Sequence, residues 1–148
     1  MTVGGCSASG PKPGVAKATV DSMMEASLNA AGLRGVSGDV ERGWSLCEDL
    51  GPKDRQTYHW SIFYAQFSGP EGPGVDKARH YVQAIRDYWT KRAKDPGEHL
   101  DVKESSGAGG LTGDVMVRTD GFYTSASFPS TTVGATSPCV TRSGPYLP

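Results

Sequence analysis

The segment Val75–Lys94 constrains the fold of this chain more than any other stretch. Its apolar residues recur at spacings of three and four, which places them on one side of an amphipathic helix: Val75, Ala78, Val82, Ile85 and Trp89. An acidic residue near its start and three basic residues near its end suit the helix dipole. Gly and Pro residues flank both ends. The segment therefore predicts a helix that buries one face against another layer.

A second helix and six short strands are predicted around this segment. Val15–Ala31 carries a stripe of small and flexible apolar residues and stops before Gly32. Six further runs have strand patterns and are separated by turn sequences: Gly43–Asp49, Thr57–Phe67, His99–Glu104, Leu111–Arg118, Phe122–Phe128 and Thr132–Val140. The order is α-β-β-α-β-β-β-β. Because strands joined by short turns pair antiparallel, we predict an α+β two-layer sandwich, with both helices on one face of an antiparallel sheet of about six strands.

The length of 148 residues fits one domain. We expect residues 1–14 to form a disordered tether rich in Gly, Ser and Pro, residues 15–140 to form a single α+β domain, and residues 141–148 to form a flexible tail. The chain has 15 basic and 16 acidic residues, and this balance gives no electrostatic footprint for nucleic acid. No apolar run approaches the ~20 residues of a membrane span.

Two of the three cysteines, Cys47 and Cys139, lie in the first and last predicted strands. First and last strands can be neighbours in an antiparallel sheet, so we predict a disulfide between them. It would close a loop of roughly 90 residues and stabilise the fold by about 4–5 kcal/mol. The alternative is a pair of buried free thiols. The sequence has no Cys-x-x-Cys or His-x-x-His spacing, so we predict no metal site and no cofactor.

Candidate catalytic residues are few. Of the three histidines, His59 lies among aromatic residues and could act as a general base, or it is simply a half-exposed strand histidine. His80 lies off the apolar stripe of its helix and His99 opens a strand, so both are expected at the surface. The Gly-rich run Ser105–Gly110 joins two predicted strands, whereas a phosphate cradle needs a following helix. We therefore predict a protein that is not an enzyme.

The aromatic strand Thr57–Phe67 allows two interpretations. Tyr58, Trp60 and Tyr64 share one face with an isoleucine between them. These aromatic residues either form core beneath the helices or an exposed platform that binds a partner. If a surface of this protein does bind, these three residues are its candidate binding surface.

The run Val3-Gly4-Gly5-Cys6 resembles the end of a bacterial lipobox, and a Ser/Gly/Pro/Lys tether follows it. Together with the helix ending in Tyr88-Trp89, the strand with Gly113-Asp114-Val115 and the late Ser137-Pro138-Cys139, the chain resembles small secreted lipoproteins of high-GC actinobacteria. The resemblance implies a lipid on Cys6, a membrane partner and an extracytoplasmic address, but no activity. Only five residues precede Cys6, fewer than a signal peptide needs, and the alternative is a free cysteine in a tail.

These observations predict a membrane-anchored, extracytoplasmic lipoprotein domain that is not catalytic and binds an envelope partner or ligand. The alternative is a carrier of a small molecule or lipid, or a small enzyme, whose pocket lies between the helices and the sheet. A purely structural envelope protein is a third possibility that the sequence does not separate from the first.

Overall fold

The computed structural model describes residues 11–35, 38–47, 57–66 and 74–141. Its helices are α1 (Pro13–Ala31) and α2 (Val75–Arg92), with a short 3₁₀ turn at Ala108–Gly110. Its strands are β1 (Asp39–Leu46), β2 (Thr57–Gln66), β3 (Asp101–Gly107), β4 (Thr112–Thr119), β5 (Phe122–Phe128), β6 (Thr131–Thr136) and β7 (Val140–Thr141). Apart from the added two-residue β7, this is the predicted order of elements.

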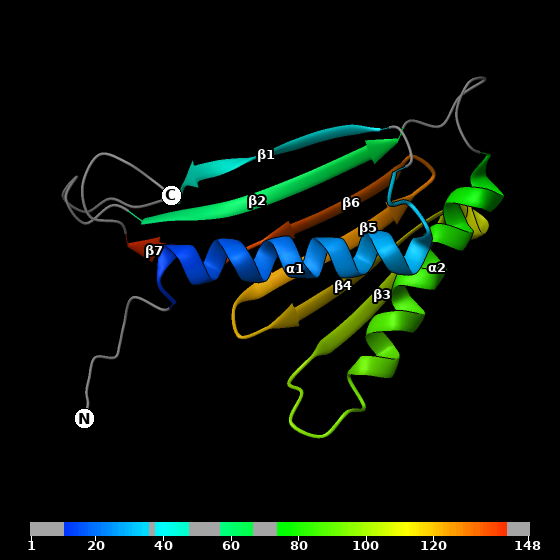
Figure 1. Cartoon of the computed structure of the whole chain (residues 1–148). Helices are drawn as coiled ribbons and strands as arrows, with labels where there is room; N and C mark the ends of the chain where they lie inside the picture. Colours follow the sequence, from blue (N-terminus) through cyan, green and yellow to red (C-terminus); the bar gives the residue numbers. More distant parts are fainter. Residues whose placement is uncertain (1–10, 36–37, 48–56, 67–73, 142–148) are drawn as a thin grey trace.

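The strands form one antiparallel sheet in the order β1-β2-β6-β5-β4-β3, and β7 pairs with the beginning of β2 (Figure 1). Consecutive strands from β3 to β6 pair as a meander, as their short turns require. Both helices lie on the same face of this sheet: α1 packs over β2 and β6, and α2 over β4 and β5 (Figure 1). The predicted two-layer α+β sandwich is therefore confirmed.

The two helices begin and end where local chemistry directs. In α2 the predicted stripe faces the core: Ala78, Val82, Ile85 and Trp89 are buried, and Val75 is half-buried. Helix α1 begins at Pro13, two residues before the predicted start, because proline at the first helical position is already set in a helical backbone angle. It ends at Gly32, whose φ of 69° is the left-handed cap conformation that glycine adopts without strain.

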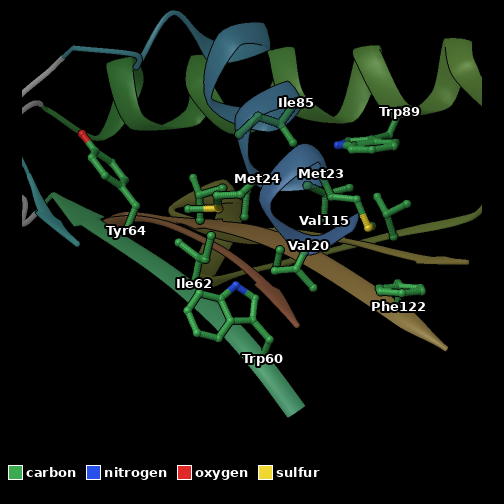
Figure 2. Packing of buried hydrophobic residues seen from close by; sticks show 14 of the residues in the cluster. Val20, Met23, Met24, Trp60, Ile62, Tyr64, Ile85, Trp89, Val115 and Phe122 are labelled. Carbon is green, nitrogen blue, oxygen red and sulfur yellow. The ribbon is translucent and has the colours of Figure 1, made fainter. Parts of the chain in front are cut away.

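The aromatic face of β2 belongs to the core. Trp60, Ile62 and Tyr64 are only 7%, 6% and 2% exposed, and they point from β2 toward the two helices (Figure 2). Tyr58, on the same face, is half-buried. Of the two interpretations of this strand, core beneath the helices is therefore confirmed for Trp60 and Tyr64, and the exposed platform is wrong, because the helices cover this face. On the opposite face of β2, Phe63 is 45% exposed.

Two strand boundaries differ from the prediction: the beginning of β1 and the end of the last predicted strand. Strand β1 begins at Asp39, four residues before the predicted start at Gly43, since its backbone pairs with β2 from Asp39 opposite Ala65. The last predicted strand is interrupted after Thr136. There the buried Ser137 donates its backbone N–H to the Trp60 carbonyl and accepts the Trp60 backbone N–H on its hydroxyl, both at 2.9 Å. These two hydrogen bonds keep the chain attached to β2. The following proline has no backbone N–H and therefore interrupts the β-ladder.

The Tyr64 hydroxyl is buried and has no hydrogen-bond partner within the described ranges. Burial, with a smaller contribution from Tyr81, raises the pKa of Tyr64 above 10.0. We expect Tyr64→Phe to raise the free energy of unfolding at pH 7 by about 1 kcal/mol, because it removes an unsatisfied buried group. Since the folded-state pKa is raised, the protonated phenol contributes stability that is complete below the unfolded pKa and is lost as pH rises through the folded pKa. Urea unfolding at pH 7 and 10.5 should show that the variant loses less stability at the higher pH.

Candidate functional site

Cys47 and Cys139, which are 92 positions apart in sequence, form a disulfide with their Cα atoms 6.2 Å apart. The predicted pairing is confirmed, but the reason given for it is wrong. The first and last strands are not neighbours, because β7 pairs with β2 and β2 lies between β7 and β1. The interruption after β6 lets Cys139 reach across β2 toward Cys47.

His59 of β2 lies beside this bridge. Its Nδ1 is 3.4 Å from the Cys47 Sγ, and the side chain is half-buried. The Nδ1 and both sulfurs lie within 4.8 Å of one another. Cys47 is 7% exposed, whereas Cys139 is exposed. His80 and His99 are exposed, as predicted, and they are not part of this group.

The disulfide determines which chemistry the side chains of Cys47, Cys139 and His59 can perform. Two thiolates and an imidazole are ligands that zinc prefers, but a disulfide uses both sulfurs in the S–S bond. The prediction of no metal site therefore stays a prediction. In the oxidised protein, the chemistry available to Cys47, Cys139 and His59 is that of a disulfide with a nearby hydrogen-bonding group.

A small cavity lies between α2 and the β3–β4 side of the sheet, with a volume of about 180 Å³. Val82 of α2, Val115 of β4 and Phe128 of β5 give it an apolar wall. The Phe128 ring occupies the space where a side chain at Gly113 would begin, since a Cβ there would lie 2.6 Å from the ring. Glycine at this position therefore leaves room for the Phe128 ring beside β4 at the cavity wall.

Four charged side chains line the cavity: Arg79 and Arg86 of α2, Glu104 of β3 and Asp114 of β4. Arg79 donates to the Gly110 carbonyl at 2.7 Å and holds its guanidinium 5.5 Å from the centre of the Phe128 ring. Arg86 donates to Glu104 across the cavity mouth at 3.4 Å. The backbone and aromatic contacts of Arg79 fix its direction, and the hydrogen bond to Glu104 holds Arg86 at the same cavity.

The carboxylates paired with these arginines are solvated. The side chains of Asp76, Asp87 and Glu104 are 88%, 69% and 60% exposed. Ion pairs of this kind contribute about 0–1 kcal/mol, so an incoming anion can exchange with them. Beside the carboxylates of Glu104 and Asp114, the cavity thus offers two cationic donors and an apolar wall, which suits a small ligand with an anionic group and a short apolar part.

The alternative interpretation of the sequence expected a pocket between the helices and the sheet, but it did not identify the residues that line this cavity. Arg79 and Arg86 are seven residues apart on α2, on either side of Val82, and that spacing puts them on one side of a helix. The candidate residues Tyr58, Trp60 and Tyr64 do not line it. The candidate lipidation site, Cys6, lies outside the described residues.

Comparisons with protein-family models, curated proteins and solved structures found no match to this chain. In the part of the chain that the structure describes, neither helix is both long and apolar enough to cross a membrane.

Proposed function

We propose that this protein is a non-catalytic domain of the cell envelope, extracytoplasmic and anchored to the membrane by a lipid on Cys6, which binds an envelope partner or ligand. The observation that carries the proposal is the Cys47–Cys139 bridge. Disulfides persist in oxidising compartments and are rare where thiols are kept reduced. A bridge between two distant parts of one small domain therefore supports an address outside the cytoplasm.

A lipid on Cys6 would hold the domain close to the membrane. Seven residue steps separate Cys6 from Pro13, where α1 begins. A fully extended chain spans at most about 3.6 Å per residue, so the start of α1 would lie within about 25 Å of the anchored sulfur. The proposal thus limits how far the N-terminal end of α1 can lie from the bilayer.

Peptide-mapping mass spectrometry without reduction tests this proposal. Protein is taken separately from the membrane and soluble fractions of its own cells. We expect a diacylglyceryl group on Cys6 and a linked Cys47–Cys139 peptide in the membrane fraction. A Cys6→Ser variant should move to the soluble fraction with its bridge intact. Unmodified Cys6 together with free thiols at the other two positions, in soluble protein, would overturn the proposal.

The cavity beneath α2 favours a second candidate function, the binding of a small molecule. Its volume of about 180 Å³ lies below the ~300–1,000 Å³ of sites for drug-sized ligands, so it suits a small ligand or one group of a larger one. Arg79 and Arg86 select for a carboxylate or phosphate, which arginine binds through paired hydrogen bonds. Val82 and Phe128 select for an apolar part beside it.

Titration of the isotope-labelled protein with small carboxylates and phosphates, followed by NMR, tests this second function. We expect shifts at Arg79, Arg86 and Phe128 that saturate, and at least a tenfold loss of affinity in Arg79→Ala and in Arg86→Ala. The matched control is Arg34→Ala, which removes an exposed arginine of a surface ion pair outside the cavity. Equal weakening in all three variants would indicate general charge attraction and would contradict a specific site.

A further inference from the structure

The geometry points to a second property of the bridge: the Cys47–Cys139 disulfide is a thiol–disulfide exchange site, which forms mixed disulfides with external thiols at Cys139. This inference does not depend on the lipid anchor or on the cavity. It rests on the unequal exposure of the two cysteine residues and on the position of His59 beside the Cys47 sulfur. The chemical class of the partner is a thiol, either of low molecular weight or on another protein.

The difference in exposure selects the sulfur that is attacked. An attacking thiolate approaches along the S–S axis, so it needs access to one sulfur from the side opposite to the other. Cys139 is exposed and lies in the interruption between β6 and β7, whereas Cys47 is 7% exposed. The external thiolate therefore attacks the Cys139 Sγ, and Cys47 is the leaving group.

The exchange step balances without a further reactant. A bond forms between the external sulfur and the Cys139 Sγ, the Cys47–Cys139 bond breaks, and its electron pair stays on the Cys47 Sγ as a thiolate. A second external thiolate can then attack the external sulfur of the mixed disulfide. That step releases the oxidised external disulfide and leaves Cys139 as a thiolate, so two thiols are oxidised and the bridge is reduced.

His59 is positioned to assist the first step. Its Nδ1 lies 3.4 Å from the Cys47 Sγ, the atom on which negative charge develops. An N–H at this nitrogen donates to the thiolate, and hydrogen bonds to charged groups are worth more than those between neutral groups. His59 thus acts as a positioning residue that stabilises the leaving thiolate on Cys47, while Cys139 receives the partner.

Trapping the mixed disulfide tests which sulfur is attacked. The full chain with Cys6→Ser, to remove the third thiol, is mixed with limiting glutathione and quenched with N-ethylmaleimide before peptide mapping. We expect glutathione on Cys139 and the maleimide on Cys47. Glutathione mainly on Cys47, or equally on both cysteines, would overturn the assignment.

The rate of bridge reduction tests the role of His59. Since a hydrogen bond to a charged group is worth ~1.5–3 kcal/mol, we expect His59→Ala to slow reduction roughly 10- to 100-fold. His59→Asn keeps a donor near the same place and should recover part of the rate, and His80→Ala, exposed on α2, is the matched control. A purely structural role for His59 predicts the opposite result: the variant would loosen the fold, expose Cys47 and accelerate reduction. An unchanged or faster rate in His59→Ala would therefore overturn the inference.

Discussion

Replacing both bridge cysteines by alanine should lower the free energy of unfolding by about 4–5 kcal/mol, on the chain-entropy estimate for a loop of this length. The bridge joins Cys47 to Cys139 across 92 positions, so it restricts most of the unfolded domain. Small domains are stable by ~5–15 kcal/mol, so the loss is a large share of the total. Urea denaturation followed by circular dichroism measures it. The slope of the transition should also rise, because an unfolded chain without the bridge exposes more surface.

Wild-type protein in a reducing agent is the control for this experiment. It has the same side chains without the cross-link, so it should lose nearly the same free energy as the double alanine variant. A single variant at the exposed Cys139 should behave like the double variant, because either change opens the loop. A loss below about 1 kcal/mol in the reduced wild type would contradict the estimate, since it would mean that the open chain retains the constraint.

Much of this fold could be predicted from periodicity. The stripe of α2 is also its buried face, and β5 has the predicted bounds Phe122–Phe128. Alternation fixes which residues of a strand share a face, and turn sequences fix which strands follow one another. The whole meander from β3 to β6 follows from these two signals, so the two-layer architecture could be inferred before the structure was known.

Periodicity could not locate the beginning of β1 or the break in the last strand. Asp39–Arg42 is exposed and, apart from Val40, charged, so its composition does not indicate a half-buried strand. It is a strand because the backbone of β2 extends far enough to pair with it. At Ser137 the sequence alternation continues although the β-ladder stops. The Ser137 hydroxyl, instead of a backbone carbonyl, accepts the Trp60 backbone N–H.

The candidate sites depend on which elements pair, and no local pattern contains that information. Cys47 donates its backbone N–H to the Thr57 carbonyl, which places His59 diagonally across the hairpin from Cys47. A shift of one residue in the register would turn His59 to the other face. In the same way, Arg79 and Arg86 form a cavity only because α2 crosses over β4 and β5, and that crossing is set by packing.

Trp89→Ala is the second change with a large expected effect. Trp89 of α2 is 2% exposed and belongs to the same core cluster as Trp60, Ile85 and Val115 (Figure 2). Truncating a buried tryptophan to alanine typically costs about 3–5 kcal/mol, because transfer energy is lost and a cavity remains. We expect a fall of that size in the free energy of unfolding, measured by urea denaturation.

The energetic contribution of one hydrogen bond inside this core can be measured separately from that of the packing. The Trp89 Nε1–H donates to the Ser27 hydroxyl of α1 at 2.9 Å, and both groups are buried. Trp89→Phe leaves the serine hydroxyl without its donor, and Ser27→Ala leaves the indole N–H without an acceptor, so each should lose about 1–3 kcal/mol. The double variant removes both polar groups, so its loss should be smaller than the sum of the single losses. Additive losses would show that Trp89 joins the two helices by packing alone. A clear coupling would instead show that the hydrogen bond fixes how α1 and α2 lie against each other, and with them the apolar layer over the sheet.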